Sequence, residues 1–268
     1  MNKTILSTAP ESQNFMKTNP ATKLGIALAG VLALSAISTT CHAATLADGL
    51  VAHYELDGNA LDSSGNGANG TIYNNVVPTT DRFGVPNAAM YFPANFDAIR
   101  GTGINVANSS SSISLWVDKQ YLGNLVNGSW ILRVGDVGAN GKVMHVALDY
   151  GQSIRYSFWN DTFDINSPIL PFDEWHHLAF TFDDTINQQK IYVDGSLAAT
   201  RTAAYGFSGN TTFEFGNVNM KMDDIRFYNR VLSPTEVTLL QITPEPSSAL
   251  LLLGSALPLL LRRRRAAV

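Results

Sequence analysis

Residues Trp175–Gly195 read WHHLAFTFDDTINQQKIYVDG and carry the clearest fold signal in this sequence. Apolar residues alternate with polar or smaller ones along Leu178–Phe182, which is the two-residue period of a half-buried β-strand. The alternation in Ile191–Val193 leads into Asp194-Gly195, a dipeptide that favours tight hairpin turns because both residue types tolerate a positive φ. This stretch therefore predicts β-strands and a hairpin turn.

Similar alternation recurs earlier in the chain. Leu50–Leu56 and Ile113–Val117 each place apolar residues at every second position. Gly, Asn, Asp and Ser fill the gaps, most densely in Asp62–Gly70, and no long segment has the period of a helix. Many short strands over about 200 residues exceed the roughly 100 residues of an immunoglobulin domain. We therefore expect an all-β fold, a two-sheet antiparallel jelly-roll sandwich.

One short helix is expected at the C-terminal end of this domain. Ser233 precedes Pro234, and Glu236 follows three residues after Ser233, which is the pattern of a capping box with proline in the first turn. We expect this helix to reach about Gln241, and the predicted domain spans residues 44–241.

The N-terminal residues 1–43 have the features of a signal peptide. Lysines precede an uncharged apolar run, Leu24–Ile37, and a polar segment with small residues ends at Ala43, where we expect cleavage. The run is shorter than the about 20 residues that span a bilayer, although a retained anchor is the alternative. Met16 would begin a signal of ordinary length and is a possible true start.

The C-terminal residues 242–268 form a second targeting segment. Pro244, Glu245 and Pro246 precede a short apolar segment, 249–261, which spans about 20 Å as a helix against about 30 Å of hydrocarbon. Four basic residues follow, namely Arg262, Arg263, Arg264 and Arg265. Together these features resemble the PEP-CTERM sorting signal of Gram-negative bacteria. The resemblance implies removal by an exosortase, and a plain tail anchor is the alternative.

Without these two ends the chain is strongly acidic. The whole sequence has 22 acidic and 18 basic residues. Between Ala44 and Thr243 there are 20 acidic and 11 basic residues, so this part has a net charge of −9. Binding of nucleic acid or anionic lipid needs a basic patch, so nucleic acid is not an expected partner. The only cysteine, Cys41, lies in the predicted signal peptide, so no disulfide is expected in the exported domain.

Four blocks of the central domain occur in a recognisable order. They are Leu50–Gly65, Ile113–Val117, Trp175–Gly195 and Asp223–Ser233. The ordered set resembles the laminin-G-like, concanavalin A-like modules of secreted bacterial proteins. This resemblance implies a β-sandwich that mostly binds glycans or proteins and less often accompanies an enzyme.

Glycoside hydrolysis is the main catalytic alternative for such a sandwich. Laminarinase-type enzymes resemble one another in a Glu-x-Asp-x-x-Glu strand, and retaining hydrolysis needs two carboxyl groups about 5–5.5 Å apart. Glu55–Ala60 is the nearest match and lacks the second glutamate. Asp183-Asp184 and Asp223-Asp224 are adjacent pairs, which point to opposite faces of a strand. We therefore expect no catalysis, with a jelly-roll polysaccharide-degrading enzyme as the weaker alternative.

A structural calcium ion is the one cofactor that the residues suggest. Ca²⁺ takes about 6–8 oxygen ligands. The candidate ligands are Asp57, Asp62, Asn66 and Asp223. Asp223 shares the alternation of Ile225, so we expect it to point inward at a strand end, where a bare carboxylate is costly. The alternative is that Asp62 and its neighbours only form Asx turns.

The outer face of one predicted hairpin is the candidate ligand site. If the alternating apolar residues of Met144–Tyr150 and Ile154–Phe158 share the core, a three-residue turn, Gly151–Ser153, joins the two strands. This register places Asp149 opposite Arg155 and His145 opposite Trp159, with Arg133 beside them. Such an aromatic plane among polar groups suits a sugar, and the alternative is an ordinary exposed cross-strand pair.

These observations predict a non-catalytic binding module of the cell surface or the exopolysaccharide matrix of a biofilm. Its expected ligand is a polysaccharide or matrix glycan. Signal peptidase and exosortase are the expected partners during export, when the precursor associates transiently with the inner membrane. The alternative from another class is a purely structural or adhesive matrix protein.

Overall fold

The computed structural model describes residues 46–94, 96–120, 130–136, 138–148, 153–160 and 165–243. The predicted signal peptide, the sorting motif with its apolar and arginine segments, and Asp149 lie outside these ranges. Within them, no helix combines the length and the apolar character that a membrane crossing requires.

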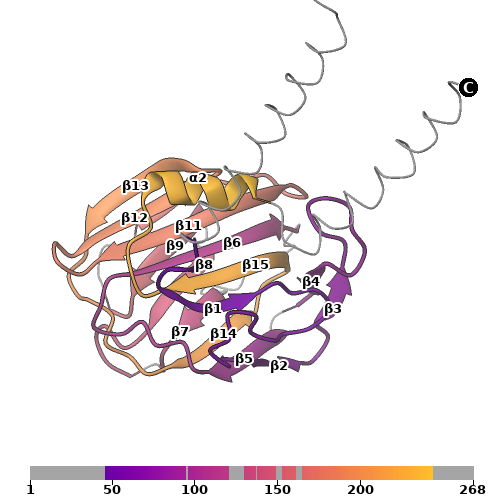
Figure 1. Ribbon diagram of the computed structural model, residues 1–268, viewed down its shortest axis with the longest axis horizontal. Coiled ribbons are helices and arrows are strands. Elements are labelled where there is room, and N and C mark those ends of the chain that lie inside the picture. Colours follow the sequence, from indigo (N-terminus) through magenta and orange to yellow (C-terminus); the bar gives the residue numbers. More distant parts are fainter. Residues whose placement is uncertain are drawn as a thin grey trace, which may run out of the picture. The chain divides into compact units, whose positions relative to one another are not determined.

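Two antiparallel sheets form a sandwich, which confirms the predicted all-β, two-sheet class (Figure 1). The strands of sheet A are β1 (Leu50–Tyr54), β3 (Val77–Thr79), β4 (Ala89–Phe92), β6 (Ser111–Lys119), β11 (Trp175–Asp183), β12 (Gln188–Val193), β13 (Ser196–Thr202) and β15 (Met220–Tyr228). Their order is β13-β12-β11-β6-β15-β4-β3, and β1 also pairs with β15.

Sheet B forms the second layer. Its strands are β2 (Gly70–Tyr73), β5 (Ala98–Thr102), β7 (Trp130–Val134), β8 (Met144–Leu148), β9 (Ser153–Phe158), β10 (Ile165–Ile169) and β14 (Thr212–Gly216). Their order is β10-β9-β8-β7-β14-β5-β2. Neighbouring strands in both sheets are often distant in the sequence, so most pairings join segments that only the folded chain brings together.

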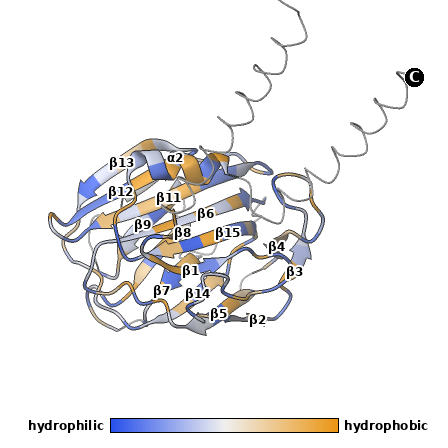
Figure 2. Ribbon diagram, viewed as in Figure 1, coloured by the Kyte–Doolittle hydropathy of each residue, from blue (hydrophilic) through white to orange (hydrophobic). Residues whose placement is uncertain are grey.

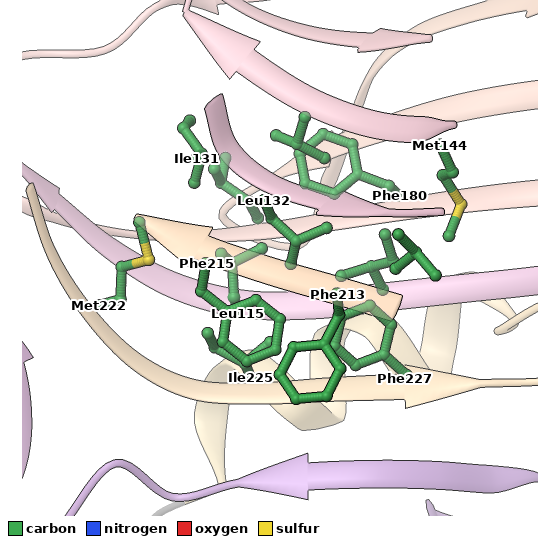
Figure 3. Close-up of a cluster of buried hydrophobic side chains, with 14 of the residues drawn as sticks. Leu115, Ile131, Leu132, Met144, Phe180, Phe213, Phe215, Met222, Ile225 and Phe227 are labelled. Atoms are coloured by element: carbon green, nitrogen blue, oxygen red, sulfur yellow. The ribbon is translucent and has the colours of Figure 1, made fainter. Parts of the chain in front are cut away.

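The inner faces of the two sheets share one hydrophobic core (Figure 3). The ring centroids of Phe180 on β11 and Tyr156 on β9 lie 5.3 Å apart, and those of Phe215 on β14 and Phe227 on β15 lie 5.8 Å apart. All four side chains are buried. Apolar and polar residues follow one another along the strands, as half-buried strands require (Figure 2).

Helix α2 (Pro234–Ile242) covers part of the outer face of sheet A (Figure 1). Its Val237 and Leu240 pack in a second apolar cluster that includes Ala179 of β11. The Ser233 hydroxyl accepts from the Glu236 amide at 3.3 Å, and the Ser233 amide donates to the Glu236 carboxylate at 2.8 Å. The predicted capping box and helix are therefore confirmed.

The hairpin prediction at Asp194-Gly195 is also confirmed. Both residues have positive φ values, 48° and 75°, and Val193 pairs with Ser196 across the turn. Two consecutive positive φ angles match the right-handed twist of the flanking strands, which explains the preference for Asp-Gly.

The predicted register of the β8–β9 hairpin is wrong by two residues. Arg155 lies opposite Ala147 rather than Asp149, and His145 lies opposite Ser157 rather than Trp159. A shift by two residues leaves every side chain on its predicted face, because the side-chain period of a strand is two. Alternation therefore identifies the faces of these strands correctly but cannot identify the neighbours across the strand pair.

The inward direction predicted for Asp223 is also wrong. The pairing of β15 with β6 shifts between Asp223 and Arg226, and Asp224 between them has a φ of 51°. This irregularity adds one residue to β15 and reverses the facing of the residues before it. Asp223 consequently pairs with Trp116 on the outer side of sheet A instead of pointing into the core.

Candidate ligand-binding site

A small pocket with two tryptophans lies on the outer face of sheet B. Its cavity measures about 200 Å³. The lining residues are Trp130, His145, Arg155, Ser157, Phe158, Trp159 and Asn160. The centroids of the two indole rings lie 6.4 Å apart with 29° between the planes, and the His145 ring meets Trp130 edge-on at 4.6 Å.

Strand pairing explains how Trp130 reaches this pocket. The register of β7 against β8 shifts between Trp130 and Leu132, so Trp130 lies opposite Ala147 while Arg133 lies opposite His145. The extra residue places Trp130 and Arg133 on the same face although they are three positions apart. Sequence alternation did not identify Trp130, because only the paired strands show the irregularity.

His145 supplies a buried, neutral polar group to the lining of the pocket. The side chain is buried, and its Nε2 lies 2.6 Å from the Ser157 hydroxyl. Burial and, to a lesser degree, the positive charge of Arg155 lower the pKa of His145 to about 3. The imidazole is therefore uncharged at neutral pH and forms hydrogen bonds rather than ion pairs.

Three of the five predicted ligand residues line this pocket. Trp159, Arg155 and His145 come together there, although the predicted cross-strand partners were different. Arg133 is engaged elsewhere, because its guanidinium lies 3.2 Å from Glu214, which also accepts from Arg100 at 2.7 Å. Asp149 lies outside the described residues.

Asp62 holds a loop together. Its Oδ1 accepts from the backbone amides of His53 and Ser64, both at 2.9 Å, and its Oδ2 accepts from that of Ala68 at 3.0 Å. Burial opposes ionisation of Asp62, but these hydrogen bonds lower its pKa overall. The three bonds favour the alternative that Asp62 organises turns.

Two of the other predicted calcium ligands are engaged in contacts of their own. The Asn66 amide donates to the Leu50 and Val51 carbonyls at 3.1 and 3.0 Å, and Asp223 pairs with the guanidinium of Arg82. Asp57 is partly exposed on the same loop. Among the residues that the structure describes, no group of three or more His, Cys, Asp or Glu is placed to hold a metal ion.

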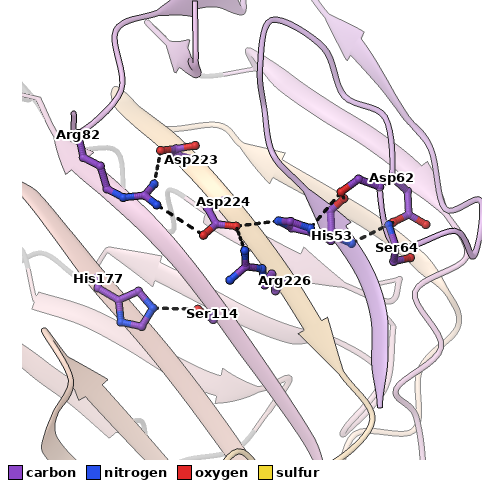
Figure 4. A network of polar contacts seen from close by, with 10 residues as sticks. His53, Asp62, Ser64, Arg82, Ser114, His177, Asp223, Asp224 and Arg226 are labelled. Atoms are coloured by element: carbon purple, nitrogen blue, oxygen red, sulfur yellow. Dashed lines mark hydrogen bonds and ion pairs between the residues drawn. The ribbon is translucent and has the colours of Figure 1, made fainter. Parts of the chain in front are cut away.

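A buried polar network crosses the outer side of sheet A (Figure 4). Arg82, from the loop after β3, contacts both Asp223 and Asp224, while Arg226 lies 2.9 Å from Asp224. His53 Nε2 lies 2.7 Å from Asp224 Oδ1. Two carboxylates and two guanidinium groups balance one another, which makes the burial of these charges tolerable.

The same network contains a chain of contacts from Ser63 through His53 to Asp224, with the two imidazole nitrogens exchanged relative to a serine hydrolase triad. Ser63 Oγ lies 3.0 Å from His53 Nδ1 and also 3.1 Å from the His53 carbonyl oxygen, which accepts from it. Two arginines share the Asp224 carboxylate. These bonds tie the loop after β1 to β15, and we assign them a structural role.

Comparison with known families identifies the class of the domain. A laminin-G-type family model, described as the concanavalin A-like lectin/glucanases superfamily, matches residues 93–238. This is more than half of the chain, so the protein belongs to this superfamily. No curated protein matches the sequence.

Solved structures of binding domains have the same fold. The binding domain of botulinum neurotoxin serotype D is 16% identical with a TM-score of 0.60, covering 73% of this chain and 51% of that one. The binding domain of Paraclostridial Mosquitocidal Protein 1 is 18% identical with a TM-score of 0.61, covering 73% and 52%. At these identities the comparison shows the fold alone. The chain spans about half the length of these structures.

Proposed function

We propose that this protein is a non-catalytic binding module that recognises polysaccharide through the pocket on the outer face of sheet B. The observation that carries the proposal is the pair of half-buried indole rings, Trp130 and Trp159, beside the polar groups of His145 and Ser157. Ligand sites combine apolar surface with a few fixed polar groups. A sugar ring needs both, because its C–H faces are apolar and its hydroxyls form hydrogen bonds.

The lining of the pocket argues against glycoside hydrolysis there. Hydrolysis needs a pair of carboxyl groups flanking the scissile bond. His145 and Arg155 are the titratable groups that line the pocket within the described ranges, and neither is a carboxylic acid. The superfamily includes both lectins and glucanases, and the pocket favours the lectin role.

The fold relatives support ligand binding of two kinds. One related structure is the binding domain of botulinum neurotoxin DC in complex with SialylT, and another is the same domain in complex with rat synaptotagmin II. A glycan is the partner that the tryptophan pair favours here. A structural or adhesive matrix protein is the alternative outcome of the test below.

We further propose that the chain is exported and reaches the cell surface or extracellular matrix. The support is the N-terminal apolar run before Ala43 and the order of Pro244-Glu245-Pro246, an apolar segment and an arginine cluster. Both segments lie outside the described residues.

A glycan array probed with the purified full-length chain tests the binding proposal. We expect retention on at least one polysaccharide, and loss of that retention in Trp159→Ala. Self-association in solution with no retention on any glycan would favour the structural alternative. Release of shortened sugars from the retained polysaccharide would favour the enzyme.

A further inference from the structure

A second pocket, called the polar pocket below, has four polar side chains among its lining residues. Its cavity measures about 460 Å³, and its lining includes Asp136, Lys142, Ser208 and Asn210. The residues come from two loops, one between β7 and β8 and the other between β13 and β14. Neither loop was identified as a candidate site from the sequence.

Glycines allow these two loops to approach closely. A Cβ atom on Gly209 would lie 2.1 Å from the carbonyl oxygen of Lys142 in the other loop, which is too close for any side chain. The Ser208 amide donates to the Gly141 carbonyl at 2.8 Å, and the Lys142 ammonium donates to the Ser208 carbonyl at 2.7 Å. These hydrogen bonds join the two loops beside the second pocket.

The polar groups of the second pocket suit sugar hydroxyls. The Asp136 carboxylate accepts from the Asn210 amide and from the Thr212 hydroxyl, and these bonds hold its pKa below the usual range. Each carboxylate oxygen has a second lone pair, and the Asn210 amide nitrogen carries a second hydrogen. An acceptor next to a donor matches two neighbouring hydroxyls of one sugar.

A single loop connects the two pockets. Ala139 and Lys142 line the polar pocket, while Asn140 between them accepts from the Asn160 amide at 3.0 Å and donates to the Tyr205 hydroxyl at 3.2 Å. The Gly141 amide donates to the Trp159 carbonyl at 3.0 Å. Asn160 and Trp159 both line the tryptophan pocket, so one four-residue segment of this loop, 139–142, contacts both sites.

The cavity volumes of the two pockets can be compared with those of known ligand sites. Ligand pockets usually measure about 300–1,000 Å³. The tryptophan pocket, at about 200 Å³, is below this range, whereas the polar pocket, at about 460 Å³, is within it. The tryptophan pocket alone is therefore too small for a complete ligand.

We infer that the two pockets bind successive units of one neutral polysaccharide chain, with stacking on Trp130 and Trp159 and hydroxyl recognition by Asp136 and Asn210. This inference rests on the proposed function and adds the length and the chemistry of the ligand. The carboxylate of Asp136 and the ammonium of Lys142 give the lining of the polar pocket no net charge, so the sugar that it takes is neutral.

An oligosaccharide array of graded length tests this inference on the full-length chain. The array carries neutral and uronic-acid oligosaccharides of two to eight units. Wild-type binding to a neutral series should rise at least tenfold between the disaccharide and the hexasaccharide. Asp136→Ala and Asn210→Ala should lose that gain while leaving disaccharide binding unchanged, and Trp159→Ala should weaken both.

Two further variants serve as controls for binding and for folding. Asp48→Ala removes an exposed carboxylate outside both pockets and should bind like the wild type. Asp136→Asn keeps the shape of the side chain and should reproduce the loss of length dependence if Asp136→Ala fails to fold.

Three other results of the array experiment would each contradict a specific claim. Wild-type hexasaccharide binding in the folded Asp136 and Asn210 variants would overturn the two-pocket inference and leave the single-pocket function standing. Preference for the uronic-acid series would overturn the assignment of a neutral sugar. Binding to no glycan by the wild type would overturn the proposed function together with the inference.

Discussion

The indole rings of Trp130 and Trp159 lie 6.4 Å apart with 29° between their planes, although Trp130 begins β7 and Trp159 follows β9. Strand β8 separates the two strands in sheet B, and its His145 lies against Trp130. The tryptophan pair therefore depends on the register of three paired strands. The pocket forms only when β7, β8 and β9 are correctly paired in sheet B.

The first prediction concerns Trp159→Ala. The ring is half-buried and contacts Trp130, so its loss should lower the free energy of unfolding by about 1 kcal/mol, the typical value of an aromatic pair. Glycan affinity should fall by about 2 kcal/mol, or roughly 30-fold, if the ring is a binding hot spot. Urea melts and affinity electrophoresis measure the two effects. Tyr73→Ala, which removes an exposed aromatic outside the pocket, is the control and should leave affinity unchanged.

The second prediction concerns Asp224→Asn. This change leaves Arg226 without its buried counter-charge, while Arg82 keeps Asp223, and it should cost about 3–5 kcal/mol at neutral pH. Burial opposes ionisation of Asp224, but Arg226, His53 and Arg82 hold its pKa at about 2. The ionised carboxylate therefore stabilises the fold above about pH 4, and this contribution disappears as the pH falls toward 2. Urea melts at pH 7, 4 and 3 should show the gap between wild type and variant narrowing. A constant gap would contradict the assigned ion pairs.

The third prediction concerns acid sensitivity from two buried histidines. Burial lowers the pKa of His145 to about 3 and that of His177 to about 4, against 6.5 in the unfolded chain. Below pH 6.5 these histidines are protonated in the unfolded chain but remain neutral in the native state. The free energy of unfolding therefore decreases as the pH is lowered. Each histidine contributes about 1.4 kcal/mol per pH unit down to its folded pKa. His145→Gln should reduce the slope between pH 6 and 4, and an unchanged slope would show that His145 is protonated in the native state.

The fourth prediction separates turn formation from calcium binding at Asp62. Asp62→Ala removes the acceptor of three backbone amides and should cost about 2–3 kcal/mol, since hydrogen bonds to charged groups are strong. If Asp62 only organises the loop, EDTA should leave the melting temperatures of the wild type and the variant unchanged. A lower wild-type melting temperature in EDTA, reversed by added Ca²⁺, would instead support the calcium site.

The fifth prediction concerns processing of the two ends. The mature chain should begin near Ala44 and lack the residues after Pro244-Glu245-Pro246. Intact-mass analysis of protein extracted from the cell surface measures this directly. A mass that still includes Arg262–Arg265 would exclude removal of the tail and support a tail anchor.

Local patterns in the sequence identified the elements that depend on neighbouring residues. Ser233, Pro234 and Glu236 predicted the start of α2, because a capping box is completed within four residues. Asp194-Gly195 predicted its hairpin, because the turn requires positive φ at only these two positions. Alternation predicted which residues of β8 and β9 face the core, because successive side chains of a strand point to opposite faces.

Other features depended on how distant strands pair. The sequence by itself determined the all-β class, the buried faces of β8 and β9, the hairpin turn and the capped helix. Only the tertiary structure decided that Trp130 joins Trp159, that Asp223 turns outward toward Arg82, and that Arg133 pairs with Glu214. The physical reason is that an irregularity in one strand reverses the facing of the residues before it, and a register shift of two residues changes the neighbours of a side chain, although the local sequence pattern is the same in each case.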